Sequence, residues 1–309
     1  APSSPVRIGI LGSSWWADSM YLPALAQHPH GRVTALAGHD AATLAQRWNV
    51  PHAFARHEDL LHSGVVDAVI IATRNDQHGP LTLTALDQGL HVLCEKPLGL
   101  TYIEAAQMAA RAGEVGAICM TPFTYRYMPA PRYLKRLLDD GYIGRPFHLN
   151  FRYFTGFGRA GGYNWRFDEH VSGSGALGDI ASHFLYLAWW FYGDITAVFA
   201  ELGRLVERAS LDPAGHPYPQ ADDNAMIMLK FASGAQGLLH ASTVANEATP
   251  FGQIHAFDLH GDGGALHAEV DWASAQRIRG ARIGAGALEE LPIPDDIWQG
   301  ARRDTVHNT

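Results

Sequence analysis

The first residues whose types and spacing suggest chemistry form a glycine-containing loop near the start of the chain. Gly12–Ala17 (GSSWWA) directly follows the apolar run Val6–Leu11 and opens an amphipathic stretch. In a dinucleotide-binding loop the first glycine makes a tight turn and the second lets the backbone approach a pyrophosphate, while a third small residue packs the helix on the sheet. Gly12 and Ala17 fit the first and third roles, and Ser14 stands at the second. The spacing therefore predicts a phosphate-binding loop at a helix N-terminus.

A simpler interpretation of this loop is an ordinary strand–helix turn with a serine cap. Two adjacent tryptophans argue against it, because bulky aromatic side chains at an exposed turn are hard to explain unless they cover a ligand or a domain contact. We therefore expect the cofactor-binding residues of this loop to be Gly12, Ser13, Ser14, Trp15 and Trp16.

The end of the second strand bears on the choice between NAD and NADP. An acidic residue there would hold the ribose hydroxyls of NAD and repel the extra phosphate of NADP. Gly38 occupies that position and His39 follows it, so a carboxylate is missing and a potential cation lies beside the gap. The pattern favours NADP and makes His39 a predicted cofactor-binding residue. NAD stays open, since Asp40 is only two residues further along.

Apolar runs alternate with amphipathic stretches through the first third of the chain. The expected strands are Val6–Leu11, Arg32–Ala37, Ala68–Ala72, His91–Cys94 and Gly116–Met120, and the expected helices are Ser19–Gln27, Ala41–Trp48, Gly79–Gln88 and Tyr102–Ala112. Strands this rich in Val, Ile, Leu and Ala are typical of a sheet covered on both faces, and the alternation predicts parallel strands with right-handed crossovers. Residues 1–121 are thus predicted to form a dinucleotide-binding Rossmann domain with a doubly wound parallel sheet.

Strands dominate after Thr121. The expected elements are helices at Pro129–Asp140 and Gly178–Phe191 and strands at Pro146–Tyr153, Thr196–Val206, Asn224–Phe231, Gln236–Val244 and Gln253–Gly261. Residues 122–309 are predicted to form an α+β domain with a large, mostly antiparallel, open-faced sheet. This domain would bind substrate and mediate assembly into a homodimer or homotetramer, because an open sheet face often packs on another subunit.

Composition limits the other partners. The net charge of −8 and the lack of a basic run argue against nucleic acid or an acidic membrane surface. The short lead-in Ala1–Pro5 carries no apolar targeting segment, and Cys94 and Cys119 lie in apolar runs typical of buried strands in a reducing compartment. The 17 histidines are scattered without metal-ligand spacing, so no metal site is predicted. We expect a cytoplasmic protein.

Short motifs in collinear order resemble those of the Gfo/Idh/MocA oxidoreductases. Besides the glycine loop they are Thr73–His78 (TRNDQH), Cys94–Pro97 (CEKP), Tyr125–Pro129 (YRYMP), Tyr142–Pro146 (YIGRP), Gly175–His183 (GALGDIASH) and His260–Leu266 (HGDGGAL). The resemblance implies an NAD(P)-dependent dehydrogenase or reductase that acts on CH–OH groups of a sugar, polyol or related small molecule.

By motif position, the resemblance implies the catalytic residues Lys96, Asp179 and His183. Separately, a lysine at a strand end is usually a solvated charge, and Asp and His four residues apart are often a surface pair. Their joint occurrence favours an active site, since Asp179 and His183 share a helix face and Lys96 lies at the ligand-binding edge of a parallel sheet. His183 would take a substrate proton and Lys96 would stabilise the oxygen, or the reverse, while Asp179 positions the substrate.

The resemblance implies further binding residues and a cis Lys96–Pro97 bond. The expected cofactor contacts are Thr73, Asn75, His78, Glu95 and Lys96, although Asn75 and His78 would serve nearly as well as loop caps. Lys96, Asp179 and His183 would also contact the substrate. The additional substrate-binding residues would be Arg126, Tyr163, Trp165 and Arg166, because Trp can stack on a sugar and Arg can bond its hydroxyls. Ordinary packing is the alternative for the aromatic residues.

Some positions depart from the family pattern. Ser14 replaces a glycine, Arg74 replaces a proline, and Tyr186 stands where an acidic residue often follows the catalytic histidine. The chain ends at Asp304–Thr309, where relatives continue, so either a segment is missing or this member is short. An NAD-dependent glycosidase and a non-catalytic sugar or nucleotide sensor are the alternative functions, and the presence of Lys96 and His183 disfavours the sensor.

Overall fold

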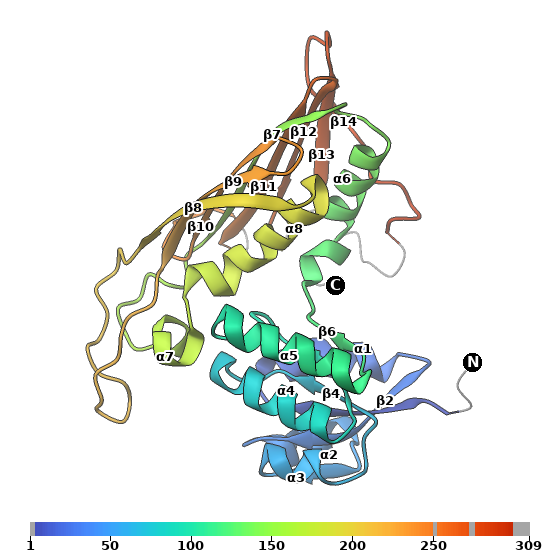
Figure 1. Cartoon of the computed structure of the whole chain (residues 1–309), viewed down its shortest axis with the longest axis vertical. Helices are drawn as coiled ribbons and strands as arrows, with labels where there is room; N and C mark the ends of the chain where they lie inside the picture. Colours follow the sequence, from blue (N-terminus) through green and yellow to red (C-terminus); the bar gives the residue numbers. More distant parts are fainter. Residues whose placement is uncertain (1–3, 250–251, 272–275, 299–309) are drawn as a thin grey trace. The chain divides into compact units, whose positions relative to one another are not determined.

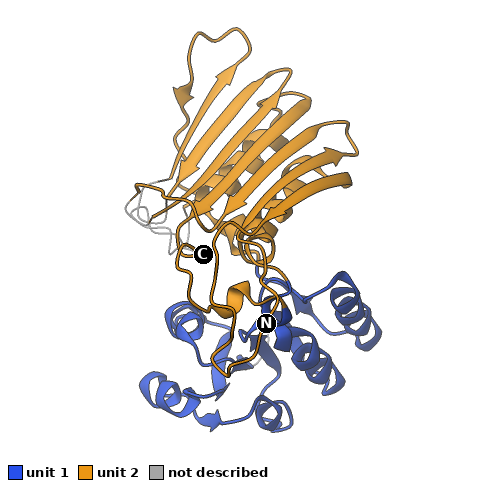
Figure 2. Ribbon diagram, turned by 90° about the vertical axis from the view of Figure 1, so that its left-hand side faces the viewer, with its two compact units in different colours: residues 1–122, 170–173 blue, residues 123–169, 174–309 orange. Residues whose placement is uncertain are grey.

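The computed structural model describes residues 4–249, 252–271 and 276–298, which form two compact units (Figure 2). Unit 1 comprises residues 1–122 and 170–173, and unit 2 comprises residues 123–169 and 174–309. The chain passes between them at Pro122–Phe123, against a predicted boundary after residue 121. Residues 170–173, which we expected in the second domain, belong to unit 1. The predicted chain end at 304–309 and the first residues of the lead-in lie outside the described residues.

Unit 1 has a six-stranded sheet of parallel strands in the order β3-β2-β1-β4-β5-β6, which confirms the predicted doubly wound topology (Figure 1). Its strands are β1 (Val6–Leu11), β2 (Gly31–Ala37), β3 (His52–Phe54), β4 (Ala68–Ile71), β5 (His91–Cys94) and β6 (Cys119–Met120). The order reverses between β1 and β4, and ligands of such sheets bind beyond the carboxyl ends of the strands at that reversal.

The helices of unit 1 follow the predicted alternation. They are the π-helical turn η1 (Ala17–Tyr21) with α1 (Leu22–Ala26), α2 (Ala41–Trp48), α3 (His57–Leu61), the 3₁₀ turn η2 (Asn75–Gln77) with α4 (His78–Asp87), and α5 (Tyr102–Val115). Sequence patterning missed β3, because a three-residue strand with two exposed side chains has no apolar run, and it missed α3, which has only five residues.

Successive residues of the central strands face opposite sides of the unit 1 sheet. Ile10 and Ile70 pack in one buried cluster, whereas Leu11 and Ile71 pack in another. The sheet is therefore covered on both faces, as its continuous apolar strands predict. Cys94 is buried as expected, but the same expectation for Cys119 is wrong, since it lies exposed in the two-residue edge strand β6.

Unit 2 has an eight-stranded sheet in the order β14-β13-β12-β11-β7-β10-β9-β8. Its strands are β7 (Pro146–Thr155), β8 (Ile195–Gly203), β9 (Asn224–Phe231), β10 (Gln236–Ser242), β11 (Gln253–Gly261), β12 (Gly264–Val270), β13 (Arg277–Arg282) and β14 (Glu289–Glu290). Among the described strands of this sheet only the β7–β10 pair is parallel, which confirms a mostly antiparallel sheet. The sequence patterns did not indicate β12, β13 and β14.

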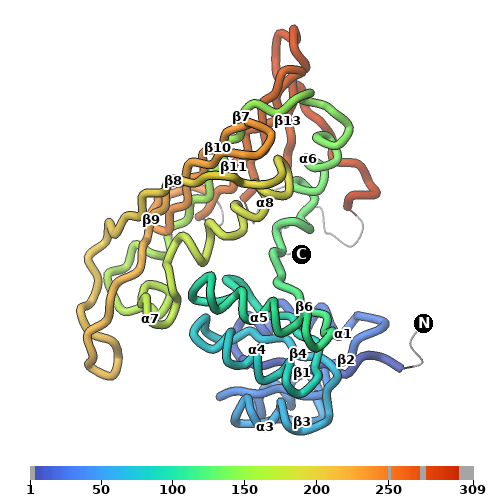
Figure 3. Tube along the Cα trace, in the orientation of Figure 1, coloured from blue at the N-terminus to red at the C-terminus, as the bar shows by residue number. Residues whose placement is uncertain are grey.

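Helices cover one face of this sheet. The helical segments are the 3₁₀ turn η3 (Thr124–Tyr127), α6 (Pro129–Asp139), the 3₁₀ turn η4 (Trp165–Phe167), α7 (Glu169–Ser172), which straddles the two units, and the π-helical turn η5 (Leu177–Ala181) with α8 (Ser182–Tyr192). Phe184 and Leu187 of α8 pack with Phe151 and Phe257 of the sheet in one core. Figure 1 shows α6 and α8 on the same side, and Figure 3 follows the long connection from β8 to β9.

Candidate active site

The glycine loop of unit 1 lies between the carboxyl ends of β2 and β4. Gly12 has φ +102°, and a Cβ built there would overlap the carbonyl oxygen of Ala72. Its backbone N–H donates to the carbonyl oxygen of Ala37 at 2.9 Å. Only glycine fits this turn, because other residues rarely adopt such a φ and would also collide with the chain after β4. Gly12 therefore makes the tight turn that the sequence predicts.

The missing acid at the end of β2 has a structural cause. Gly38 has φ +137°, and a Cβ there would lie 2.7 Å from the Oγ of Ser13. That Oγ accepts a hydrogen bond from the backbone N–H of Asp40 at 2.8 Å. A side chain at position 38 would thus be strained and would displace Ser13. The next side chain, His39, is 98% exposed.

Trp16 and Tyr21 bind the buried carboxylate of Glu95. The indole nitrogen of Trp16 donates to Oε1 at 2.7 Å, and the hydroxyl of Tyr21 donates to the same oxygen at 2.5 Å. Burial, followed by the Glu95 charge, raises the pKa of Tyr21, so its hydroxyl stays protonated as a donor. This network gives Trp16 a role within the fold, whereas Trp15 is 64% exposed.

Lys96 lies at the carboxyl end of β5, one residue beyond Glu95. Its backbone N–H donates to Glu95 Oε2 at 3.1 Å, and the Lys96–Pro97 peptide bond is cis, as expected. The carbonyl oxygen of Pro97 lies 2.8 Å from Nδ1 of His78. The edge that carries Lys96 is therefore held by two buried polar side chains, Glu95 and His78.

His78 and Asn75 have partners within unit 1. Besides its Pro97 contact, His78 has Nε2 3.3 Å from the carbonyl oxygen of Thr73, and burial lowers the pKa of this imidazole. The side-chain nitrogen of Asn75 donates to the carbonyl oxygen of Ser172 at 2.9 Å. These contacts favour the loop-cap alternative for both residues. Thr73 is half-buried, and its hydroxyl donates to the Arg74 carbonyl oxygen at 3.3 Å.

In unit 2, Asp179 and His183 lie near the start of the long helix. Asp179 belongs to the π-helical turn η5, and π-helical turns occur frequently at functional sites. Its Oδ2 is 3.4 Å from Nε of Arg166. His183 is buried and stacks on Tyr125 at a ring-centroid distance of 4.1 Å. The structure thus brings together the predicted residues Asp179 and Arg166, and it restrains the His183 ring.

Sequence reasoning missed the buried rings beneath His183. Tyr125 and Tyr153 share a hydrogen bond of 2.7 Å between their hydroxyls, and His255 lies 4.2 Å from Tyr153 between ring centroids. Burial lowers the pKa of His255 to about 3 and raises the pKa of Tyr153. Tyr153 and His255 are paired across β7 and β11 on the covered face. Their inward positions in alternating strands were the available signal.

Each of the other predicted substrate residues contacts a different partner. The ring centroid of Trp165 lies 4.5 Å from the guanidinium carbon of Arg166, the same side chain that contacts Asp179. Tyr163 donates instead to Asp168 at 3.1 Å. Arg126 donates to the hydroxyl of Tyr186, whose ring stacks on Phe123.

Tyr186, one of the positions that depart from the expected family pattern, is therefore the partner of Arg126. Throughout the described ranges, no three His, Cys, Asp or Glu side chains are grouped so that they could hold a metal ion. No helix in the described part of the chain is long and apolar enough to cross a membrane.

Comparisons with known proteins match both units. A model of an oxidoreductase family with an NAD-binding Rossmann fold matches residues 6–123, and a model of the Gfo/Idh/MocA C-terminal domain matches residues 131–267. Together they cover more than half of the chain.

Individual relatives act on sugars by name. Levoglucosan dehydrogenase of Pseudarthrobacter phenanthrenivorans is 29% identical over 73% of this chain and 61% of its own length. D-xylose 1-dehydrogenase (NADP(+)) of Haloarcula marismortui is 32% identical over 58% of this chain and 52% of its own length. A solved structure of levoglucosan dehydrogenase, in complex with NADH and levoglucosan, superposes with a TM-score of 0.82 at 25% identity, over 93% of this chain and 80% of that chain.

Proposed function

This chain belongs to the Gfo/Idh/MocA family of oxidoreductases, and from that premise we propose that it oxidises or reduces a hydroxyl or keto carbon of a sugar, polyol or related small molecule with NAD(P). The observation that carries the proposal is the Gly12 turn between β2 and β4, where a Cβ would meet the Ala72 carbonyl oxygen. A glycine so constrained at the sheet reversal leaves backbone available to a dinucleotide pyrophosphate.

The cofactor would be held by unit 1. Gly12, Ser13 and Ser14 would face the phosphates, Trp15 has the exposure needed to cover the dinucleotide, and Glu95 would set the edge around Lys96. When bound, the nicotinamide supplies the hydride acceptor or donor. Thr73, Asn75 and His78 would shape the neighbouring loop.

The chemical step would use Lys96 with Asp179 and His183. In the oxidative direction His183 takes the proton of the substrate hydroxyl, and Lys96 stabilises the developing negative charge on that oxygen. In the reductive direction His183 returns the proton. Arg166 holds Asp179 at 3.4 Å, which would aim the carboxylate at a substrate hydroxyl, while Trp165 offers an apolar ring to a sugar face. In the alternative assignment Lys96 transfers the proton and His183 stabilises the charge on the oxygen.

NADP is the favoured cofactor in this proposal. An acidic side chain at position 38 would collide with Ser13. The side chain of His39 is almost fully exposed, with Nε2 4.0 Å from Oδ1 of Asp40, and would turn toward a 2′-phosphate. The relatives differ in this respect, since one is named for NADP(+) and another was solved with NADH.

Titration of nucleotide-stripped protein with NADPH and NADH tests the cofactor, with tryptophan fluorescence as the signal. We expect quenching by both and tighter binding of NADPH. Nicotinamide absorbance should then change with levoglucosan, D-xylose or an inositol as substrate. Failure of both nucleotides to bind would refute the proposal, and cleavage of a glycoside without net change in absorbance would replace it by a glycosidase.

The open face of the unit 2 sheet supports a homodimer or homotetramer. Phe199, Met228 and Leu238 are paired across β8, β9 and β10 and are all exposed. A contiguous apolar row of this kind is suited to burial against a second copy.

The two cysteines form no disulfide with each other, in keeping with the proposed cytoplasmic location.

A further inference from the structure

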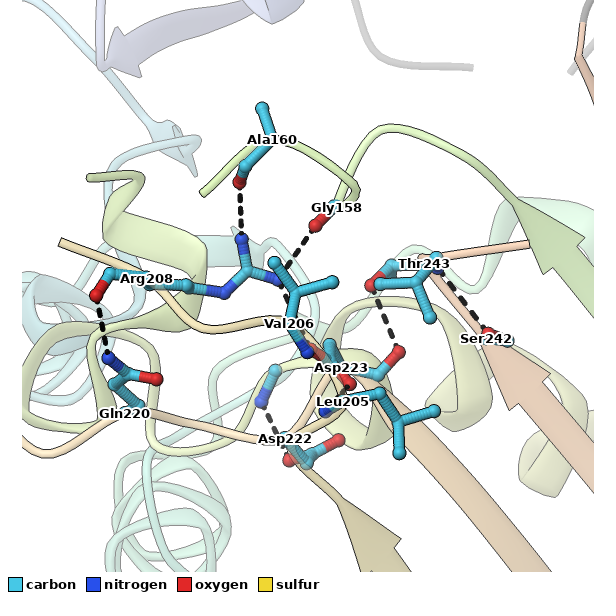
Figure 4. Close-up of polar contacts among 12 residues, drawn as sticks. Gly158, Ala160, Leu205, Val206, Arg208, Gln220, Asp222, Asp223, Ser242 and Thr243 are labelled. Carbon is cyan, nitrogen blue, oxygen red and sulfur yellow. Dashed lines mark hydrogen bonds and ion pairs between the residues drawn. The ribbon is translucent and has the colours of Figure 1, made fainter. Parts of the chain in front are cut away.

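Two adjacent buried carboxylates precede β9 and bind different segments of unit 2 (Figure 4). Asp222 and Asp223 are 4% and 1% exposed. Neither residue is part of the proposed chemistry. Since a buried carboxylate is costly unless it is paired or hydrogen-bonded, the partners of each one show what it stabilises.

Asp222 binds the start of the helix that carries Asp179 and His183. Its Oδ1 accepts from the backbone N–H of Gly175 at 2.9 Å, and its Oδ2 accepts from that of Leu177 at 2.7 Å. The contact is close, because a Cβ at Gly175 would overlap the Asp222 carbonyl oxygen. The carbonyl oxygen of Gly175 in turn accepts from the backbone N–H of Asp179 at 2.9 Å. Asp222 is thus two hydrogen bonds away from the backbone of Asp179.

Asp223 accepts from the backbone N–H groups of Leu205 and Val206, at 2.9 and 3.0 Å, and it also contacts the guanidinium of Arg208. Its Oδ2 lies 3.4 Å from Nη2 of Arg208, and both side chains are 1% exposed. Arg208 donates to the carbonyl oxygens of Gly158 and Ala160, each at 2.8 Å, and its Cζ lies 3.6 Å from the centroid of the Phe167 ring. These contacts flank, on both sides, the segment that contains Tyr163, Trp165 and Arg166.

We propose that Asp222 and Arg208 are positioning residues of the active site, Asp222 for the helix with Asp179 and His183, and Arg208 for the loop with Trp165 and Arg166. This inference rests on the proposed function. Asp222 acts through the groups that would do the chemistry, so its loss should lower kcat. Arg208 acts through a loop whose residues would contact the substrate without taking part in the proton transfer, so its loss should chiefly raise KM.

The chemistry of each side chain makes it hard to replace. Two backbone N–H groups point at the two oxygens of Asp222, and an asparagine would turn its own N–H₂ toward one of them. Arg208 spans two carbonyl oxygens and a carboxylate with one planar group, whereas a lysine ammonium is a single point donor on a flexible stem. Asp222→Asn and Arg208→Lys are therefore the informative variants, because each keeps the size of the side chain.

The matched controls are Asp212→Asn and Arg204→Lys. Asp212 also accepts from two backbone N–H groups, those of Ala214 and His216, but in an exposed turn. Arg204 pairs with Glu169 at the surface. Circular dichroism, together with amide exchange in the strands of unit 2, reports whether each variant is folded. If Asp222→Asn does not fold, Asp222→Glu takes its place, since it retains both acceptor oxygens while shifting them by one methylene.

Hydrogen exchange and steady-state kinetics test the proposal together. Asp222→Asn should speed amide exchange in residues 174–184 alone and lower kcat by about tenfold to a hundredfold, with little change in KM. Arg208→Lys should speed exchange in residues 156–168 alone and raise KM by about tenfold. Equal effects of both variants on kcat and KM, or exchange unchanged in those segments, would overturn the inference. Exchange is read without turnover, so wild-type protein that oxidises no sugar would refute the proposed function alone.

Discussion

The indole nitrogen of Trp16 lies 2.7 Å from Glu95 Oε1 and joins the glycine loop to the strand end that carries Lys96. The two residues are 79 positions apart in the sequence. Because the same carboxylate accepts from the backbone N–H of Lys96, a displacement of the loop is passed to Lys96 through one side chain. The loop and the proposed catalytic lysine are thus parts of one hydrogen-bonded unit.

Trp16→Phe should remove this link. We expect the free energy of unfolding to fall by about 1–3 kcal/mol, because a donor to a buried charge is lost while Tyr21 remains. Urea unfolding measures the change, and Trp15→Phe is the matched control, since Trp15 is exposed and should leave stability unchanged. Equal stability of the two variants would show that the Trp16 hydrogen bond contributes nothing.

Lys96→Met should abolish turnover and leave nucleotide binding nearly intact. The loss in kcat should be about a hundredfold or more, the magnitude found when one stabilising group is removed from a reacting oxygen. Lys135→Met serves as the control, because Lys135 forms a surface ion pair with Asp139. A Lys96→Met variant with wild-type rates would refute the assignment.

His39→Asp should reverse the nucleotide preference. A carboxylate at this exposed position would repel a 2′-phosphate and could accept bonds from ribose hydroxyls. The ratio of the NADPH and NADH dissociation constants should move by about tenfold or more toward NADH, which is about 1.4 kcal/mol. Fluorescence titration provides both constants. An unaltered ratio would mean that His39 does not face the adenosine ribose.

His255 should make the protein sensitive to acid. Its pKa is about 3 in the folded protein, against an ordinary value of 6.5, so the unfolded chain binds a proton that the folded protein does not. Stability is therefore complete above pH 6.5 and falls as the pH drops toward 3, by about 1.4 kcal/mol per pH unit. Between pH 6.5 and 5, His255→Phe should lose about 2 kcal/mol less than wild type. Parallel curves of unfolding free energy against pH would contradict this.

Met228→Glu should weaken self-association. The substitution places a charge in the exposed apolar row formed with Phe199 and Leu238. We expect the dissociation constant to rise at least about tenfold in light scattering or sedimentation. Ile103→Glu, on the exposed start of α5, is the control that should assemble like wild type. A wild-type protein that is monomeric at micromolar concentration would remove the basis of this prediction.

Local patterns were sufficient where the physical cause is local. Apolar runs and helical spacing predicted β1, β5, β9, β11 and α2 with the bounds that the structure has. Gly12 was identifiable because a strand–turn–helix junction requires a residue that tolerates positive φ. Lys96 was placed correctly at a strand end, since the end of the apolar run before it marks the edge of the sheet.

Features that depend on distant contacts were decided only by the tertiary structure. Cys119 is exposed because it lies in an edge strand. The order of the strands cannot be predicted from the local spacing of apolar residues. The hydrogen bonds of Glu95 with Trp16 and of Asp222 with Gly175 join residues far apart in the sequence, so they depend on the crossovers and the sheet register. The sequence by itself determined the two kinds of sheet and the residues able to do chemistry. The folded chain decided which of those residues are held in place, because hydrogen bonds between buried groups require partners that no sequence spacing specifies.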